Sequence, residues 1–436
     1  MAFQQGLSGL NATTKSLSVI GNNIANANTY GNKAARAEFS DVYANAMNGS
    51  GSNGIGIGVN LTSVVQQFSQ GNISTTESNL DLAINGGGFF QLDNNGSTVY
   101  SRNGQFQLNK DGYIVNAGGN KLLGYAASTA GTVIPSTVQA LKLPTAGVAP
   151  HATDLATLEL NLDSRQPVTG PGATVPIDFQ DPKTFNNATS ISVYDDKGQE
   201  VALTLYFQKT KIDAVNGDLW DVYATANGQS FPTPLAPVIP GMTFKPDGSG
   251  LDLTATPMPF TLPPIPAVAL PGGGTSLDIP STAAQAATPP VTGVLLDLTA
   301  TSYGSSFSVT NLTQNGYAPG ELTGINIDKT GIISAQYSNG QTKNAGQVVL
   351  STFRNPQGLQ PLGGNAWAAS FASGDPIIGA PGQGNIGALQ SGALEESNVD
   401  LTAELVNMIV AQRAYQANAQ TIKTEDQVMQ TLVNLR

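Results

Sequence analysis

Helical heptad patterns at the two ends of this chain constrain its fold more than any other feature. At the N-terminus a seven-residue spacing links Phe3, Leu10, Leu17 and Ile24. At the C-terminus, between Leu401 and Val433, small or apolar residues recur mostly at alternating steps of four and three. A helix with one narrow apolar stripe needs a partner helix to cover it. The stripes lie about four hundred residues apart, so we expect the chain ends to pair and the segment between them to be looped out.

The larger residues of these stripes are the candidate site, because a chain with a helical stripe at each end is organised like a polymer subunit. Ile20 is included since it falls, with Thr13 and Ala27, at the second heptad position of the N-terminal helix. The predicted assembly residues are Phe3, Leu10, Leu17, Ile20, Ile24, Leu401, Leu405, Met408, Tyr415, Ile422, Met429 and Val433.

The first 30 residues carry a single charge, on Lys15. A helix with so little charge is poorly matched to water, and its Asn, Ser, Thr and Gln side chains suit hydrogen bonds with neighbouring subunits. The alternative is a helix buried inside an ordinary domain. Asparagines from Asn22 onward compete for backbone hydrogen bonds, so we expect this helix to end near residues 24–30.

Composition restricts the possible partners. The chain has no cysteine, which excludes disulfides and thiolate metal sites. Its single histidine, His151, argues against a His-ligated metal centre. Only 11% of residues are charged and the formal net charge is −11, so no basic surface for nucleic acid or acidic lipid is indicated. We expect protein partners, no cofactor and no metal ion.

The sequence contains no membrane span and no secretion signal that we can identify. No run of eighteen apolar residues occurs, and the start MAFQQGLSGL lacks the basic residues and apolar stretch of a cleavable signal peptide. Taken plainly, this indicates a cytoplasmic protein. A cysteine-free, low-charge β chain would also suit the cell exterior, which leaves export by a route that does not read such a signal.

The middle of the chain has the features of β structure, with 49 glycines and 26 prolines marking its turns. Alternation over residues 55–61 predicts an extended strand. Turns are expected at Asn95-Gly96, Asn103-Gly104 and Asp111-Gly112. Residues 189–225 predict a hairpin around the turn at 195–198. The segment 231–290 holds 14 prolines and is expected to form loops and edge strands.

The C-terminal segment is expected to form one long helix. Neither glycine nor proline occurs after Gly392. Asn398 or Asp400 is a suitable N-terminal cap, and Glu404 in the first turn would favour the helix dipole.

No motif in the chain predicts an active site. GQGNIG at 382–387 fits the G-x-G-x-x-G string, but no helical segment follows it closely. His151 is the only imidazole available to a Ser-His-Asp relay, and no nucleophile motif accompanies it. The acidic pairs Asp195-Asp196 and Glu395-Glu396 are interpreted as solvated surface. We therefore expect a protein that is not an enzyme.

Three sequence blocks resemble the family of bacterial flagellar rod and hook axial proteins, and most closely its hook members. The N-terminal signature is matched by GLNATTKSLSVIGNNIANANTYGNK at 9–33. The second is matched by LDLAINGGGFFQL at 80–92 and YSRNGQF at 100–106. The C-terminal signature is matched by the block from 396 to 436, which begins ESNVDLTAELVNM. Asn32 departs from the family pattern, in which an aromatic residue usually follows the glycine.

The resemblance implies an α+β multidomain fold. Its N- and C-terminal helices would pair as a coiled coil and carry two mainly-β domains, the outer inserted into the inner. The expected parts are helices at 1–30 and 396–436, an extended connector at 31–70 and 373–395, an inner β domain at 71–144 and 313–372, and an outer β domain at 145–312.

The resemblance also implies a function. The chain would be a structural subunit of the flagellar hook, a flexible curved tube outside the cell that transmits torque from rod to filament as a universal joint. It would form a helical homopolymer and meet the distal rod, the hook cap, the hook-filament junction proteins and the type III flagellar export apparatus. It would neither bind nucleic acid nor insert into a membrane.

Two alternatives remain open at this point. The distal flagellar rod protein resembles the chain in all three signatures, although rod proteins lack a segment comparable with 145–312. A secreted β-rich adhesin or carbohydrate-active enzyme belongs to a different class, for which only the aromatic residues Tyr206, Phe207 and Trp220 are candidates.

The heptad patterns lead to a first prediction about the unassembled chain. An unpaired apolar stripe cannot offset the entropy lost on ordering, so mild proteolysis of the monomer should remove both ends and leave a β core. Mass spectrometry of the fragments identifies the cleavage sites. Protection of residues 1–30 in a verified monomer would contradict the prediction.

Overall fold

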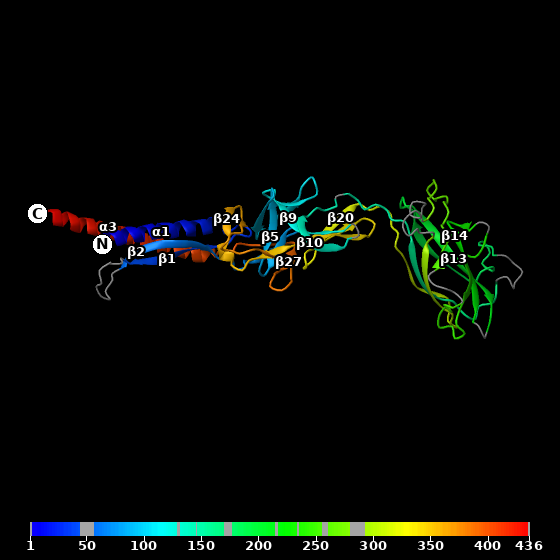
Figure 1. Ribbon diagram of the computed structural model, residues 1–436. Coiled ribbons are helices and arrows are strands. Elements are labelled where there is room, and N and C mark those ends of the chain that lie inside the picture. Colours follow the sequence, from blue (N-terminus) through cyan, green and yellow to red (C-terminus); the bar gives the residue numbers. More distant parts are fainter. Residues whose placement is uncertain are drawn as a thin grey trace. The chain divides into compact units, whose positions relative to one another are not determined.

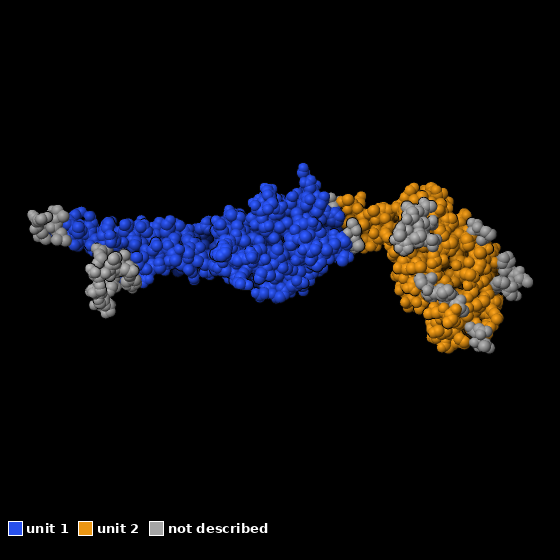
Figure 2. Space-filling model, viewed as in Figure 1, with its two compact units in different colours: residues 1–145, 323–336, 342–436 blue, residues 146–322, 337–341 orange. Residues whose placement is uncertain are grey.

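The computed structural model describes residues 2–43, 56–128, 131–144, 146–169, 177–213, 217–232, 235–254, 260–279 and 293–434. The chain divides into two compact units (Figure 2). Unit 1 contains residues 1–145, 323–336 and 342–436, and unit 2 contains residues 146–322 and 337–341. The four-part division expected from the sequence is finer than these units and stays a prediction.

Two long helices pair at the ends of the chain, as predicted (Figure 1). Helix α1 (Ala2–Ala25) ends within the expected range, and helix α3 (Leu401–Asn434) forms the C-terminal element. Asp400 caps α3, because its Oδ1 accepts hydrogen bonds from the amides of Thr402 at 2.9 Å and Ala403 at 3.2 Å. Neither described helix is long and apolar enough to cross a membrane.

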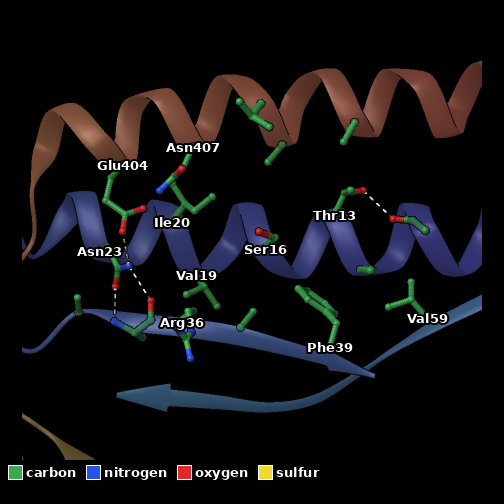
Figure 3. Close-up of a pocket in the computed structure, with 18 of the residues that line it drawn as sticks. Thr13, Ser16, Val19, Ile20, Asn23, Arg36, Phe39, Val59, Glu404 and Asn407 are labelled. Atoms are coloured by element: carbon green, nitrogen blue, oxygen red, sulfur yellow. Dashed lines mark hydrogen bonds between the residues drawn. The ribbon is translucent and has the colours of Figure 1, made fainter. Parts of the chain in front are cut away.

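A two-stranded antiparallel ribbon accompanies the helices. It consists of β1 (Ala35–Tyr43) and β2 (Gly56–Gln66), and β2 covers most of the strand predicted at 55–61. Irregularities in register occur between Glu38 and Phe39 and between Val42 and Tyr43. Helix α1 therefore lies between α3 on one side and the ribbon on the other (Figure 3).

The rest of unit 1 is built on a 13-stranded sheet with a main strand order β20-β21-β22-β9-β5-β6-β25-β24. The path strands are β5 (Phe89–Asn94), β6 (Ser97–Ser101), β9 (Lys121–Ala127), β20 (Leu322–Ile327), β21 (Ile332–Tyr337), β22 (Thr342–Val348), β24 (Gln360–Gly363) and β25 (Ala366–Ala368). The strands off this path are β7 (Phe106–Leu108), β8 (Ile114–Asn116), β10 (Val133–Ala140), β23 (Leu350–Thr352) and β26 (Ile377–Gly379).

Two short ribbons complete the β part of unit 1, which we call the β body. They pair β4 (Leu82–Asn85) with β27 (Ala388–Ser391), and β3 (Ile73–Thr75) with β28 (Ala393–Glu395). A 3-10 turn spans Pro356–Gly358. The largest core cluster of the β body includes Phe90, Phe106, Leu122 and Ile333. Each ribbon therefore joins a segment near the N-terminal helix to a segment near the C-terminal helix.

Unit 2 contains two antiparallel or mixed sheets that share one core. The four-stranded sheet has the order β17-β18-β11-β19, from β11 (Leu155–Asn161), β17 (Phe260–Thr261), β18 (Leu295–Thr301) and β19 (Ser308–Gln314). The five-stranded sheet contains β12 (Asn187–Tyr194), β13 (Glu200–Lys211), β14 (Leu219–Ala226), β15 (Gln229–Phe231) and β16 (Ile239–Thr243). Leu158 and Leu298 of the first sheet share a core cluster with Phe207 and Trp220 of the second.

The hairpin predicted at 189–225 is confirmed. Val193 pairs with Val201 across the turn, and Leu203, Leu205 and Phe207 are buried. In the proline-rich segment, β16 and β17 are short and β17 lies at the edge of its sheet, as expected. Residues 233–234, 255–259 and 280–290 of that segment lie outside the described residues.

Asn103-Gly104 does not form the predicted hairpin turn. These residues lie between β6 and β7, where the Gly104 carbonyl accepts a hydrogen bond of 3.0 Å from the Leu82 amide. A Cβ atom at position 104 would lie 1.7 Å from the Leu82 carbonyl oxygen. The glycine is thus needed for the close approach of two backbones, which the dipeptide pattern cannot distinguish from a turn.

This contact predicts a strong effect of Gly104→Ala. The added methyl group must displace the Leu82 backbone, so unit 1 should lose roughly 3 kcal/mol or more of stability, as expected for overpacking of a rigid site. Gly118→Ala is the control, because its nearest neighbour would lie 3.4 Å away. Thermal unfolding measures both variants, and equal melting temperatures would contradict the prediction.

Candidate assembly surface on the terminal helices

Small residues bring α1 and α3 close together. The helices run antiparallel, since Gly6 and Gly9 of α1 face Ile422 and Asn418 of α3, at the opposite end of the contact from Asn23 and Glu404. A Cβ atom at Gly6 would lie 3.0 Å from Ile422, and one at Gly9 would lie 2.9 Å from Asn418. The absence of side chains at these two positions therefore permits the observed distance between the helix axes.

Asn23 joins α1, β1 and α3 at the other end of the contact. Its Nδ2 donates to Glu404 Oε1 at 3.1 Å and to the Ala35 carbonyl at 2.8 Å, while its Oδ1 accepts from the Ala35 amide at 2.9 Å (Figure 3). The side chain is buried. The Asn23 side-chain amide thus forms hydrogen bonds with the backbone at the start of β1 and fixes the register of the helix pair.

The structure divides the predicted assembly residues into two groups. Ile20 is buried, and Leu10, Leu17, Ile24, Met408 and Ile422 are partly buried. Phe3, Leu401, Leu405, Tyr415 and Met429 are exposed. The side chain of Val433 lies outside the described residues. The helix pair therefore uses only part of the predicted stripes, and the assembly role of the whole set stays a prediction.

The heptad pattern placed Thr13 and Ile20 of the helix contact at its second position but missed Gly6, Gly9, Ser16 and Asn23. Gly6, Gly9, Thr13, Ser16, Ile20 and Asn23 follow steps of three and four, one residue away from the larger stripe of Leu10, Leu17 and Ile24. On α3 the facing positions include Glu404, Ala411, Asn418 and Ile422. A search for heptads of small residues would have found this face, because close helix packing favours small side chains as well as large ones.

A cavity of about 740 Å³ lies among α1, α3 and the ribbon (Figure 3). Its lining includes Val19 and Ile20 of α1, Phe39 of β1, Val59 of β2 and Val410 of α3. Polar and charged side chains also line the cavity, among them Asn23, Glu404 and Asn407. The three elements of one chain therefore do not fill the space between them.

The first turns of α3 also expose an apolar surface, which we call the α3 apolar face. It consists of Leu401, Leu405, Val406, Ile409 and Val410, whose exposed fractions run from 41% to 60%. Helix α1 covers only the side of α3 that carries Glu404 and Ala411. An exposed apolar helix face of this size marks a surface that another protein surface covers.

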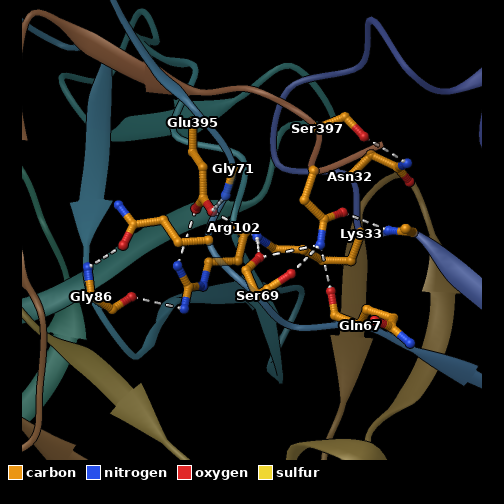
Figure 4. A network of polar contacts seen from close by, with 12 residues as sticks. Asn32, Lys33, Gln67, Ser69, Gly71, Gly86, Arg102, Glu395 and Ser397 are labelled. Carbon is orange, nitrogen blue, oxygen red and sulfur yellow. Dashed lines mark hydrogen bonds and ion pairs between the residues drawn. The ribbon is translucent and has the colours of Figure 1, made fainter. Parts of the chain in front are cut away.

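A buried ionic cluster joins the base of the helix pair to the β body (Figure 4). Glu395 Oε1 lies 2.6 Å from Lys33 Nζ, and Glu395 Oε2 lies 3.0 Å from Arg102 Nη1. The Lys33 and Glu395 side chains are 0% exposed and that of Arg102 is 4% exposed. The expectation that Glu395 lies at the surface is thus wrong, because burial beside two cations replaces its hydration. The same expectation is wrong for Asp195, which is fully buried and accepts hydrogen bonds from the amides of Lys197, Gln199 and Leu277.

Burial sets the electrostatics of this cluster. Loss of hydration lowers the pKa of the Lys33 ammonium from its ordinary value. The attraction and hydrogen bond of Glu395 act in the opposite direction, and the nearby Arg102 charge lowers the pKa further. Two cations share one carboxylate, so the cluster keeps an excess positive charge away from water.

The remaining motifs do not form a catalytic site. His151 is exposed and stacks on Tyr317 of unit 2 with ring centres 5.6 Å apart. GQGNIG lies in the turn between β26 and β27, with no helix after it before α3. No cluster of metal-ligating side chains occurs among the described residues.

Four family models match the chain in sequence order. They are described as flagella basal body rod protein (3–33), flagellar hook protein FlgE/F/G D1 domain (83–149), flagellar basal body protein FlaE D2 domain (161–317) and flagellar basal body rod FlgEFG protein C-terminal (390–435). The D2 match falls within unit 2, and the outer two matches contain most of α1 and α3. Together the four matches assign the chain to the rod and hook proteins of the bacterial flagellum.

Full-length relatives specify the family. The flagellar hook protein FlgE of Salmonella typhimurium is 40% identical over 443 residues, and that of Escherichia coli is 38% identical over 455, with 100% of both chains covered in each case. The chain therefore belongs to the flagellar hook protein family and is a structural subunit of the hook. A Helicobacter pylori flagellar hook protein FlgE2 crystal structure matches 74% of this chain and 100% of its own at 13% identity and a TM-score of 0.48, a likeness too weak to carry an argument.

The glycine contact predicts that Gly9→Leu separates the helices. The larger side chain would collide with Asn418, whereas Gly21→Leu is a control in the same helix with no atom within 4 Å of the new Cβ. We expect Gly9→Leu to lower the temperature at which assembled protein dissociates by several degrees, as for about 1 to 3 kcal/mol of overpacking. Turbidity during heating measures this, and identical dissociation of both variants would contradict it.

Proposed function

We propose that the chain polymerises with copies of itself through its terminal helices and forms a flexible, curved tube outside the cell. In this function the tube transmits torque from the rod to the filament as a universal joint. The α3 apolar face is the observation that carries the proposal, because five large aliphatic side chains remain 41% to 60% exposed after the single chain has folded.

The energetics favour coverage of this face by a protein. Removing the rest of a half-exposed Leu, Ile or Val from water contributes roughly 1 kcal/mol per side chain. Five such residues, from Leu401 to Val410, supply several kcal/mol for each subunit before any other contact is counted. The α1 surface adds Phe3 and Leu7, which are 52% and 45% exposed. These exposed groups lie on helices that α1-α3 pairing aligns with each other, so neighbouring helix pairs can pack side by side.

Further parts of the proposal rest on family membership. The relatives named above are flagellar hook proteins, which supports contact of this chain with the distal rod, the hook cap and the hook-filament junction proteins. We extend the proposal to delivery by the flagellar export apparatus without a cleavable signal peptide. The α3 apolar face and the polar residues around it contain no feature that favours a catalytic role.

The polymer proposal predicts that Leu405→Asp combined with Ile409→Asp abolishes tube formation. Both side chains are about half exposed in the single chain, so the monomer should fold, whereas burying unpaired carboxylates between subunits costs several kcal/mol. Gln420→Asp with Thr424→Asp is the control, since these exposed polar positions have the same spacing and lie more than two helical turns beyond the α3 apolar face. Sedimentation and electron microscopy measure assembly, and normal tubes from the first double variant would refute the proposal.

A further inference from the structure

Four chain segments meet at the carboxylate of Glu395. Lys33 comes from the segment between α1 and β1, Gly71 from the segment after β2, and Arg102 from the end of β6, while Glu395 ends β28 just before α3. Gly71 donates its amide to Glu395 Oε1 at 2.9 Å. The chain connects the β body to the part formed by the helix pair and its ribbon. Every such connection therefore passes close to the Glu395 carboxylate.

We infer that Glu395 and the Ser69 carbonyl form a receptor for the Lys33 ammonium, and that seating of this ammonium fixes the terminal helices to the β body during assembly. We call this contact the Lys33 latch. It rests on the proposed function, because it assumes that the terminal segments become ordered when subunits polymerise. The latch is a binding step within one chain, and packing of the α3 apolar face between subunits does not require it.

The receptor is held in place by groups other than Lys33. Arg102 donates from Nη1 to Glu395 and from Nη2 to the Gly86 carbonyl at 3.1 Å, and its Cζ lies 5.3 Å from the centre of the Phe89 ring. Glu395 belongs to β28, which pairs with β3 of the β body. With Arg102 and the Gly71 amide in position, the carboxylate is aimed at the Lys33 position whether or not the ammonium is there.

The ammonium fits this receptor specifically. Lys33 Nζ donates to Glu395 Oε1 at 2.6 Å and to the Ser69 carbonyl at 2.8 Å. A carboxylate and a carbonyl converging on one nitrogen suit a compact ammonium with several donors better than a planar guanidinium. Both the charge and the size of lysine are therefore used.

Seating of the ammonium is conditional on closure of the surrounding segment. Arg102 already neutralises Glu395, so the second cation enters a site from which water is excluded. Backbone contacts enclose it: the Gly31 amide donates to the Glu395 carbonyl at 2.8 Å, and the Ala34 amide donates to Asn398 Oδ1 at 2.7 Å. Because these partners flank α1 and α3, the latch closes fully only when both terminal segments are ordered.

The chemical reactivity of Lys33 tests this directly in the wild-type chain. A brief pulse of an amine-acetylating reagent is applied to the verified monomer and to assembled tubes, and mass spectrometry measures acetylation of Lys33 relative to the exposed Lys110. We expect Lys33 to react readily in the monomer and at least about tenfold more slowly in tubes, since a buried amine reacts only through opening of the structure.

Each result of this experiment has a defined meaning. Equal acetylation of Lys33 in tubes and in the monomer, whether high or low, would overturn the latch and leave the polymer proposal intact. If the wild-type chain formed no tubes, the polymer proposal would fail and the latch would fail with it.

A matched pair of variants tests whether the ammonium itself is required. Lys33→Ala should raise the protein concentration needed for tube formation by about tenfold or more, as for loss of one partner of a buried pair. Added ethylammonium should restore part of the loss by occupying the vacated receptor. Arg36→Ala is the control, because the Arg36-Glu38 pair is exposed and should change assembly less than about twofold. Lys33→Ala tubes that form like those of the control would overturn the inference.

Discussion

The antiparallel contact between α1 and α3 requires the chain to return to its starting point after about four hundred residues. The helix contact alone is a weak device for this purpose, since much of it consists of glycine, serine, threonine and asparagine. The β body performs the closure instead, because the β3-β28 and β4-β27 ribbons join the segments on either side of the helices. The helices then pair between segments that are already neighbours, because strand pairing in the β body has offset the entropy of closing the loop.

The elements of the fold were predictable where a local pattern carries the information. The heptads located both helices, the turn at 195–198 located a hairpin, and Asp400 was one of two predicted caps. The contacting face of the helices was predicted only in part, through Ile20 and Ile422, because the large residues at 10, 17 and 24 dominate the pattern while the close contact is made through Gly6 and Gly9. Size signals burial in general, but here the smallest residues mark the tightest packing.

The ionic cluster shows a second limit of sequence reasoning. Lys33, Arg102 and Glu395 are far apart in sequence, and none belongs to a motif that predicts burial. Glu395 even stands beside another glutamate, which favours a surface interpretation. Only the pairing of β28 with β3 brings the three groups together. Such a cluster depends on tertiary topology, so residue type and spacing alone could not have identified it.

The scarcity of charge on α1 has a consequence for the medium in which the protein works. Several of its hydroxyl groups are satisfied within the helix, such as those of Thr13, Thr14 and Ser18, which donate to carbonyls three or four residues earlier. With Lys15 as the only charge of the helix, its contacts depend on close packing and hydrogen bonds rather than on ion pairs. Ionic screening falls mainly on exposed charges. The packing around α1 should therefore be the same in dilute fresh water and in brine.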